Sequence, residues 1–413
     1  MSAQTHRARV TILVLGDLGR SPRMLNHALA FAETGADVCL GGYRETPIDS
    51  AVRNHPRIRL YRLRTLPRAP QGVPRFWFLL VTLLRSICLL LESFWFLLIK
   101  TRRSDAVLVQ NPPAVPTLFA GWLSARLRRC RFIIDWHNFG YTMLTPRLEP
   151  EHWVVRLAKR WERGLGRKAD ANLCVSRAMQ RVLRADFGVA DPVVLYDRPR
   201  EILQTVPIRA RSALAQIVLA RAGLTLPNDA ALVVCPTSWG ADEDMELLFD
   251  GLQLWDSAAS SLQLMVLITG RGPLREAFEQ RLSASSWRRT CVRTAFLDPG
   301  DYRELLCAAH FGISLHRSSS GVDLPMKIMD LFGARTPVCA LDYAACLTEQ
   351  IQPGHTALTF RTSPELAQRI DELLVGFPGD PRVLDRMQQN IEAAYPENWQ
   401  EVWQRAAGTI LRL

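Results

Sequence analysis

The chain has 413 residues, 48% of them apolar, and a formal net charge of +11. It is too long for one compact domain and too apolar for a disordered protein, so we expect two domains of roughly 200 residues each. Only four of its 51 basic residues are lysines, and a bias of this kind is weak evidence for a polyanion, so we expect no nucleic acid partner. The nine cysteines form no CxxC pair, which predicts free thiols in a reducing compartment and no structural zinc.

Short apolar runs typical of strands alternate with helical patterns along the chain. The first series lies at residues 10–16, 37–41, 58–63, 106–110, 132–135 and 172–175, and the second at 231–235, 262–269, 291–296, 312–315 and 338–341. Alternation predicts an α/β protein with two Rossmann-like, doubly wound parallel-sheet domains that face each other across a cleft, with ligands beyond the carboxyl ends of the strands. We expect a first domain at 1–200, a second at 201–390, and a C-terminal helix within 391–413 that packs back on the first.

One segment does not fit a soluble domain. Between Phe76 and Ile99, 19 of 24 residues are apolar, and the polar ones fall within about 120° on a helical wheel. The 42 residues before Glu92 contain eight arginines and no acid. This pattern favours an interfacial helix on an anionic membrane surface over a core helix whose polar stripe faces solvent. A full span is disfavoured because Arg85 and Glu92 would lie near mid-bilayer, and the N-terminal run Val10–Leu15 is too short for a signal peptide or a span.

Three loops that precede helices have the composition of a diphosphate site. The first, Gly16–Pro22, follows the first predicted strand, and Ser21 and Pro22 suit the N-cap and N1 positions of the next helix. Its glycines permit close approach of a ligand to the N–H groups of the first helical turn. The loop lacks the GxGxxG pattern, so an ordinary turn is an equal alternative.

The second loop has a more specific sequence pattern. Gly270, Arg271 and Gly272 follow an apolar strand, and Pro273 suits the N1 position of a helix whose dipole points at the glycines. A nucleotide diphosphate is the expected ligand, and a tight turn is the alternative.

The third loop, Ser318–Asp330, combines a serine run with one of the four lysines. Lys327 and Asp330 are three residues apart and share a helix face, where they could hold a phosphate oxygen and a ribose or sugar hydroxyl. A surface ion pair is the alternative, but it explains neither the serines nor the lysine.

These loops belong to a set of stretches that resemble the chitobiosyldiphosphodolichol β-mannosyltransferase family. The stretches run in family order over nearly the whole chain: LGDLGRSPRM (15–24), VQNPPAVPT (109–117), IIDWHNFGYTML (133–144), ADANLCVS (169–176), YDRP (196–199), TSWGADEDM (237–245), TGRGPL (269–274) and LHRSSSGVDLPMKIMDLFGARTPVCA (315–340).

The resemblance implies a GT-B fold, GDP-mannose as donor, and a chitobiose linked through diphosphate to a polyprenol as acceptor. An α-linked donor and a β-1,4 product mean inversion by a single displacement, which needs one general base and cationic stabilisation of the departing GDP. The resemblance further implies protein glycosylation through a lipid-linked oligosaccharide, a peripheral position on the cytoplasmic face of a membrane, other glycosyltransferases as partners, and no tightly bound cofactor.

Two residues are candidates for the base. Asp17 lies in the loop where inverting GT-B enzymes often keep theirs, whereas His137 follows a later strand and titrates nearer to working pH. Asp135 could orient His137, but we expect strand alternation to place it on the other face, so a buried structural acid is an equal alternative.

The remaining site residues follow the matching stretches. We expect Gly19, Arg20, Asn111 and Asn138 to bind the acceptor, and Gly270, Arg271, Gly272, His316, Ser320, Asp323, Lys327 and Asp330 to bind the donor. The acidic run Asp242–Asp244 resembles a metal-binding DxD motif, but its position favours a helix start, so we expect no obligatory Mg²⁺.

Two departures from the family and two rivals stay open. Eukaryotic members carry an N-terminal anchor, which we do not expect here, and usually a lysine where Arg271 stands. We therefore expect a prokaryotic homologue, with a polyprenol other than dolichol as an open alternative. A retaining GT-B enzyme acting on another lipid or polysaccharide is one rival. It is disfavoured because Val322 and Asp330 replace the paired glutamates of those enzymes. An inactive membrane-bound nucleotide-sugar binder is the other.

Overall fold

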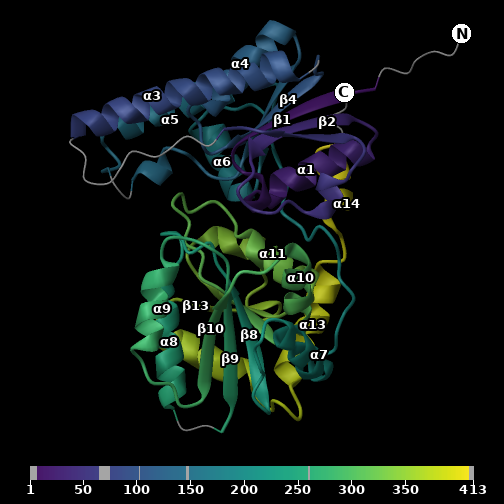
Figure 1. The fold of residues 1–413 in the computed structure, drawn as a ribbon, viewed down its shortest axis with the longest axis vertical. Coiled ribbons are helices and arrows are strands. Elements are labelled where there is room, and N and C mark those ends of the chain that lie inside the picture. Colours follow the sequence, from purple (N-terminus) through teal and green to yellow (C-terminus); the bar gives the residue numbers. More distant parts are fainter. Residues whose placement is uncertain (1–6, 65–74, 102, 146–147, 259–260, 409–413) are drawn as a thin grey trace, which may run out of the picture. The chain divides into compact units, whose positions relative to one another are not determined.

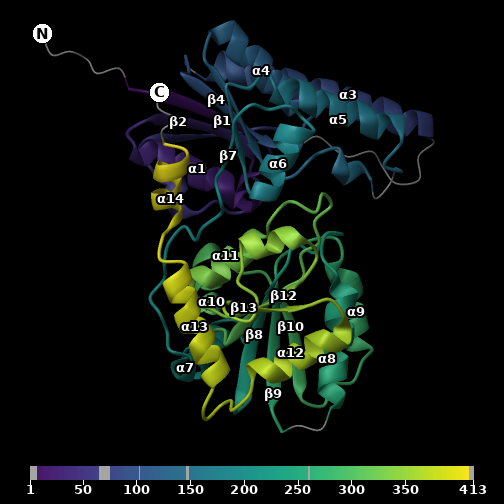
Figure 2. The same cartoon turned by 180° about the vertical axis from the view of Figure 1, so that it is seen from behind.

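The computed structural model describes residues 7–64, 75–101, 103–145, 148–258 and 261–408. The chain divides into two compact units, Met1–Tyr196 with Gln400–Leu413, and Asp197–Trp399. Each unit contains one parallel sheet with helices packed on both faces (Figures 1 and 2). The predicted α/β class with two doubly wound domains is therefore confirmed.

The first sheet has seven strands in the order β3-β2-β1-β4-β5-β6-β7. Its central strands are apolar because both faces are covered, and Ile12, Leu108 and Ile133 are fully buried. The strands are β1 (Arg9–Asp17), β2 (Asp37–Tyr43), β3 (Ile58–Arg62), β4 (Ala106–Asn111), β5 (Arg131–Trp136), β6 (Ala171–Cys174) and β7 (Pro192–Val194). The helices are η1 (Leu18–Arg20), α1 (Pro22–Glu33), α2 (Ser50–Arg53), α3 (Arg75–Phe94), η2 (Trp95–Lys100), α4 (Thr117–Arg128), η3 (Thr142–Leu144), α5 (Trp153–Gly166), α6 (Arg177–Ala185) and α14 (Trp399–Ala406).

The second sheet has six strands in the order β10-β9-β8-β11-β12-β13. Leu232, Val266 and Ile313 are fully buried within it. The strands are β8 (Ala230–Pro236), β9 (Gln263–Thr269), β10 (Thr290–Ala295), β11 (Phe311–Ser314), β12 (Val338–Leu341) and β13 (Ala357–Phe360). The helices are α7 (Ile208–Arg221), α8 (Met245–Ser257), α9 (Arg275–Ser283), α10 (Pro299–Ala308), α11 (Met326–Gly333), η4 (Ala345–Glu349), α12 (Ser363–Leu373) and α13 (Arg382–Ala394).

Every predicted strand is present, and the two that were missed, β7 and β13, lie at sheet edges. Both are short, and β7 begins with Pro192, whose missing N–H confines it to such positions.

The C-terminal boundary differs from the expected 390/391. Leu384 and Met387 of α13 lie in the core of the second unit, whereas residues from Gln400 onward group with the first. Trp403 is buried there, and its ring meets that of Phe31 edge-on at 5.0 Å.

The helix expected at 76–99 is α3 continued by the π-helical turn η2. Ser93, Phe96 and Leu97 of this helix are buried. Among the described side chains of this helix, the exposed stripe contains Leu84, Ile87, Leu91, Trp95 and Ile99, whereas Arg85 and Glu92 are half-buried. The described part of this segment therefore exposes apolar side chains, unlike a core helix with only its polar stripe in solvent. Among the described helices, none has both the length and the apolar character needed to cross a bilayer.

Candidate active site

Three neighbouring strands of the first sheet end at predicted site residues. β1 ends at Asp17, β4 at Asn111, and β5 at Trp136, which His137 follows. Because β1 pairs with β4 and β4 pairs with β5 in parallel, these ends lie at one edge of the sheet. We call it the carboxyl edge of the first unit.

Asp17 is engaged by the loop that follows β2. Its Oδ1 accepts a hydrogen bond from the N–H of Glu45 at 2.9 Å, and its Oδ2 accepts one from the Thr46 hydroxyl at 2.5 Å. Gly19 lies against the same loop, where a Cβ would overlap the carbonyl oxygen of Pro47. The carboxylate and the glycine therefore both hold this loop in place.

The helix after β1 begins at Pro22, as predicted. Ser21 does not cap it with its side chain, because the hydroxyl donates to the carbonyl oxygen of Asp17 at 2.9 Å. Arg20, the last residue of η1, is exposed beside this turn.

A buried carboxylate, Asp135, organises the carboxyl edge. Arg23 of α1 donates from Nε to Oδ2 at 2.8 Å and from Nη2 to Oδ1 at 2.9 Å. The Nε2 atoms of His27 and His137 lie 3.1 and 2.7 Å from Oδ2. The indole N–H of Trp403 in turn donates to Nδ1 of His27 at 3.0 Å.

These contacts determine the protonation states. Burial raises the pKa of Asp135, but the charge of Arg23 and the two histidines outweigh burial and hold that pKa well below its ordinary value. Burial lowers the pKa of His27, and because the Trp403 N–H occupies Nδ1, the neutral ring carries its proton on Nε2 and donates to Asp135.

An ionised carboxylate only accepts hydrogen bonds, so His137 also donates to Asp135 through Nε2–H. In the neutral ring, Nδ1 then carries the lone pair, and one fifth of the side chain is exposed. The ring orientation of His137 is thus fixed by a buried acid, as a general base would require. Our expectation that Asp135 and His137 lie on opposite faces was wrong, since residues two apart on an extended chain point to the same side.

Asn111 positions the loop after β5. It is fully buried, and its Nδ2 donates to the carbonyl oxygen of Asn138 at 3.0 Å and to Oε1 of Glu162 at 3.2 Å. The N–H of Gly140 donates to the same Glu162 oxygen at 2.7 Å. Asn111 therefore acts behind the loop, whereas Asn138 is partly exposed on it.

Glu162 of α5 is a residue that the sequence analysis missed. Burial raises its pKa to about 7, in spite of the hydrogen bonds from Asn111 and Gly140. Its Oε2 has no hydrogen-bond partner among the described residues. The signal was present, because Glu162 is the only acid of α5 and lies seven residues after the buried Val155, on the inner face of the helix.

In the second unit, the glycine loop after β9 packs on residues 237–239, which follow β8 and which we call the β8 loop. A Cβ on Gly270 would overlap the carbonyl oxygen of Thr237, and one on Gly272 would overlap that of Ser238. Gly270 also has a φ of +121°. Side chains are excluded from both positions, and the two loops can therefore approach closely.

The helix after the glycine loop starts later than predicted. α9 begins at Arg275 rather than Pro273, because the N–H of Leu274 donates to the carbonyl oxygen of Trp239 at 3.2 Å. Arg271 is exposed, and its guanidinium lies 3.8 Å from the centroid of the Phe296 ring. Its charge is thus held at the surface of the glycine loop.

Buried Glu243 joins the β8 loop to Lys327. Its Oε2 accepts hydrogen bonds from the N–H groups of Ser238 at 2.8 Å and Trp239 at 3.0 Å, and from the Thr237 hydroxyl. Its Oε1 forms an ion pair with Nζ of Lys327, whose side chain is 24% exposed. One carboxylate therefore connects the loop that supports the glycines with the lysine at the start of α11.

The acidic run around Glu243 starts a helix, as predicted. Asp244 is the N-cap of α8 and accepts from the N–H of Leu247 at 3.0 Å. The role of Glu243 itself was missed, since sequence proximity gave no sign of the distant Lys327. Within the described residues, no group of three or more His, Cys, Asp or Glu side chains is arranged to hold a metal ion.

The serine run is organised around Asp323. Nε2 of His316 lies 2.9 Å from Oδ2 of Asp323, and the hydroxyls of Ser318 and Ser320 donate to Oδ1. Burial raises the pKa of Asp323, but the hydrogen bonds from His316 and the serines bring it below its ordinary value. His316 also forms an antiparallel β-bridge with Glu243, which brings this cluster beside the lysine.

Asp330 has a different environment on α11. Its Oδ2 lies 3.5 Å from the hydroxyl of Tyr302. Burial and then the charge of Asp197 raise its pKa to about 7, against the opposing effects of Tyr302 and Lys327. A carboxyl group with this pKa can both donate and accept a hydrogen bond near neutral pH.

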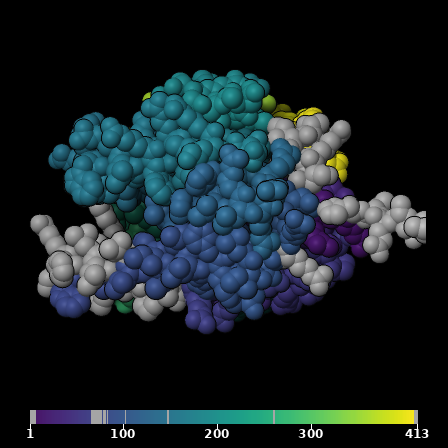
Figure 3. All heavy atoms as spheres, turned by 90° about the horizontal axis from the view of Figure 1, so that it is seen from above, coloured from purple at the N-terminus to yellow at the C-terminus, as the bar shows by residue number. Residues whose placement is uncertain are grey.

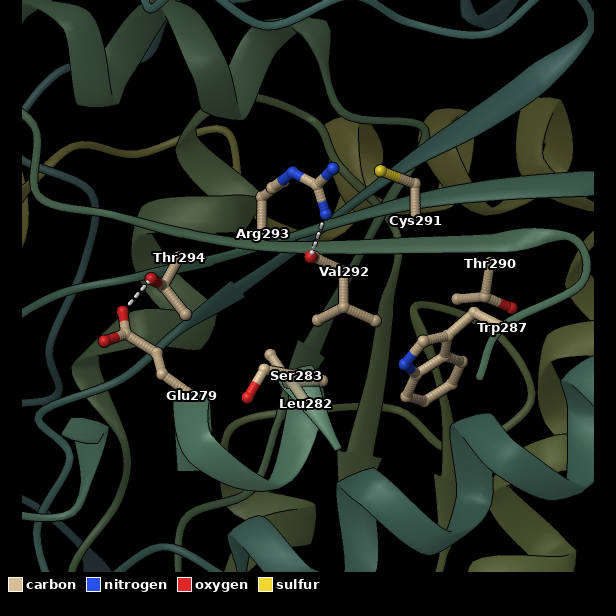
Figure 4. A pocket seen from close by; sticks show the side chains of 9 residues that line it. All are labelled: Glu279, Leu282, Ser283, Trp287, Thr290, Cys291, Val292, Arg293 and Thr294. Atoms are coloured by element: carbon tan, nitrogen blue, oxygen red, sulfur yellow. Dashed lines mark hydrogen bonds between the residues drawn. The ribbon is translucent and has the colours of Figure 1, made fainter. Parts of the chain in front are cut away.

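A hollow of about 520 Å³ lies in the second unit between α9 and β10. Figure 4 shows that Trp287, Glu279 and the side chains of the β10 edge line it. None of the predicted donor residues is among its lining residues.

Comparisons with known proteins agree with this architecture. Residues 19–196 match the glycosyl transferase 4-like domain. The chain is 33% identical to UDP-glycosyltransferase TURAN of Arabidopsis thaliana, over 98% of this chain and 97% of that protein. It is also 33% identical to chitobiosyldiphosphodolichol beta-mannosyltransferase of Mus musculus, over 99% of this chain and 90% of that protein. Sucrose-phosphate synthase from Thermosynechococcus elongatus shares the GT-B fold, with a TM-score of 0.67 at 17% identity over 98% of both chains.

Proposed function

Because this chain belongs to the chitobiosyldiphosphodolichol β-mannosyltransferase family, we propose that it transfers mannose from GDP-mannose to the terminal GlcNAc of a polyprenyl-diphosphate-linked chitobiose. The protein is a mannosyltransferase with the GT-B fold; the proposal concerns its donor, its acceptor and an inverting reaction. The α-linked mannose becomes β-1,4-linked in a single displacement, which requires one base and no covalent intermediate.

The observation that carries the proposal is the contact between Asp135 and His137. With Nε2–H directed at the carboxylate at 2.7 Å, Nδ1 of His137 accepts the proton of the acceptor hydroxyl as that oxygen bonds to the anomeric carbon. The bond from that carbon to the diphosphate breaks, and its electron pair leaves with GDP. Asp135 then faces the imidazolium and stabilises its charge. Asp17 is the weaker candidate, because its carboxylate already holds Glu45 and Thr46.

The residues around Glu243 suit a departing diphosphate. Lys327 supplies a positive charge whose position is fixed by the buried carboxylate, and Arg271 supplies a second on the glycine loop. Gly270 and Gly272 let the glycine loop pack closely on the β8 loop, which Glu243 joins to Lys327. We assign the sugar and ribose hydroxyls to His316, Ser320, Asp323 and Asp330. No metal ion is part of the proposal.

The acceptor is carried by a lipid, and the exposed stripe of α3 and η2 suits the surface of a membrane. Leu84, Leu91 and Ile99 are 52%, 62% and 70% exposed, which is unfavourable for apolar residues in water. We therefore propose peripheral attachment through this stripe, on the cytoplasmic face. All nine cysteines are free, as is usual in a reducing compartment.

Turnover tests this function directly. Purified protein is mixed with vesicles that contain a chitobiosyl-diphosphate polyprenol and with radiolabelled GDP-mannose, and, in parallel, with labelled UDP-sugars. We expect label in the lipid fraction from GDP-mannose alone, and we expect β-mannosidase, not α-mannosidase, to release it. Transfer from a UDP-sugar would contradict GDP-mannose as the donor, and an α-linked product would contradict an inverting reaction. Donor binding without transfer would identify an inactive partner.

A further inference from the structure

The outer face of α5 carries a second exposed apolar stripe. Trp153, Leu157 and Trp161 follow one another at intervals of four residues and expose 64%, 56% and 37% of their side chains. This spacing places all three on one side of the helix.

The charges of α5 complement an anionic surface. Arg156, Arg160 and Arg163 are exposed on the same helix, next to the apolar stripe. The single acid of the helix, Glu162, is fully buried on the inner face, although Glu149 and Glu151 precede the helix. An exposed face with tryptophan, leucine and arginine, and without acids, is typical of helices that lie in a membrane interface.

One aromatic side chain of α4, Phe119, contacts both α5 and α3. α4 contacts both helices. The ring of Phe119 on α4 lies 6.3 Å from Phe94 of α3 and 5.7 Å from Trp161 of α5. Figure 3 shows these segments as neighbours on one side of the first unit, in blue and blue-green. The two helices that carry the exposed apolar stripes thus both contact Phe119.

We propose that the outer face of α5 is a second lipid-contact surface, which binds an anionic bilayer together with α3. The inference rests on the proposed attachment through α3 and extends it. Exposed arginines beside exposed tryptophans favour lipid phosphates over an apolar protein partner, because each cation near an anionic leaflet adds to the attraction and needs no matched acid on a partner.

The inner face of α5 links this lipid contact to the candidate active site. Glu162 accepts from the N–H of Gly140 and from Asn111, which also holds the carbonyl oxygen of Asn138. The helix that meets the lipid therefore also supports the loop that follows His137. A lipid-borne acceptor would therefore reach the loop after His137 next to α5, the helix that supports this loop and contacts the membrane.

Vesicle binding of the full chain tests the proposal. The partition of Leu157→Glu onto vesicles of phosphatidylcholine mixed with phosphatidylglycerol is compared with that of Ile217→Glu. Both side chains are 56% exposed, and both lie on helices of 14 residues, α5 and α7. We expect Leu157→Glu to weaken partition about tenfold or more, and Ile217→Glu to leave it unchanged. Equal binding by these two variants would overturn the proposal.

A second variant changes only charge, so the proposal can still be tested if Leu157→Glu misfolds. Arg156→Gln with Arg160→Gln leaves the apolar stripe intact and should weaken binding to the anionic vesicles by about 30-fold, with little effect on phosphatidylcholine alone. Unchanged binding would contradict an anionic lipid partner. If the wild-type protein elutes from gel filtration as a dimer and Leu157→Glu elutes as a monomer, the stripe is instead a contact between two copies of the chain.

The outcome is separable from that of the proposed function. Turnover is measured with the acceptor dispersed in detergent, where a lipid contact is not required. Loss of vesicle binding with turnover retained supports the α5 surface, whereas absent turnover by wild-type protein would overturn the function and leave the binding result standing.

Discussion

Nε2 of His137 lies 2.7 Å from Oδ2 of Asp135, and both oxygens of that carboxylate also accept hydrogen bonds from Arg23. The acid is thus held from the protein interior while the histidine reaches toward solvent. This is the arrangement required of a base whose ring must not rotate during proton transfer.

Replacing the proposed base should lower the rate of transfer and leave donor binding unchanged. We expect His137→Gln to lower kcat by roughly 10² to 10⁴-fold, with the Kd for GDP unchanged, because the side chain belongs to the carboxyl edge of the first unit. Steady-state kinetics and calorimetry measure the two quantities. As a control, Asp17→Asn keeps an oxygen for the N–H of Glu45 and should lose less than about tenfold in kcat. The reverse ranking would make Asp17 the base.

Removing the charge of Asp135 should destabilise the protein. Arg23 is 1% exposed and would be left as a buried cation without its carboxylate, so we expect Asp135→Asn to lower the free energy of unfolding by about 3–5 kcal/mol. Urea denaturation measures it. The control is the surface ion pair of Arg57 with Asp37, whose charged atoms lie 3.8 Å apart and whose side chains are one third to one half exposed. Asp37→Asn should lower the free energy of unfolding by less than about 1 kcal/mol. Similar losses for both variants would mean that the buried pair is not structural.

Lys327 should contribute to nucleotide binding. We expect Lys327→Ala to weaken GDP binding about 10- to 100-fold, as for the loss of a charge-assisted hydrogen bond, and to lower turnover with it. Lys159→Ala removes a half-exposed surface lysine and is the control. Because Lys327→Ala leaves Glu243 buried without its cation, the double variant with Glu243→Gln should recover thermal stability but not GDP affinity. Wild-type GDP affinity in Lys327→Ala would contradict the phosphate role.

Glu162 should make stability depend on pH. Its folded pKa of about 7 lies above the ordinary value of 4.5, so the folded state binds the proton more tightly, and the free energy of unfolding falls as pH rises between these values. Glu162→Gln mimics the protonated form and removes that loss, which we expect to be at most about 3 kcal/mol. Melting temperatures of both proteins from pH 4.5 to 8 measure it. The melting temperature of Glu162→Gln should increase relative to that of wild type as pH rises. A constant difference between the two melting temperatures would mean that Glu162 does not titrate in this range.

Much of the fold could be predicted from the sequence, because it depends on local patterns. Apolar runs such as Leu232 to Cys235 are buried on both faces wherever they occur in a parallel sheet, and the acids before Met245 start a helix in any context. The two missed strands lie at edges, where short length and a proline weaken the pattern. The glycines at 270 and 272 were recognised as positions of close approach, although what approaches them is the β8 loop.

The chemistry of the site depended on contacts between residues far apart in the chain. Glu243 meets Lys327, and Trp403 meets His27, across distances in sequence that no spacing rule covers. Glu162 had a local sign of burial, but its partner Asn111 did not.

The sequence by itself determined the two parallel sheets, the loops at their carboxyl edges and the apolar helix, since hydrophobic periodicity and turn residues act within a few positions. Only the tertiary structure decided which acid orients His137, which carboxylate holds Lys327, and which side of the apolar helix is exposed. Hydrogen bonds and burial are settled by how distant segments pack, and a linear pattern does not contain that information.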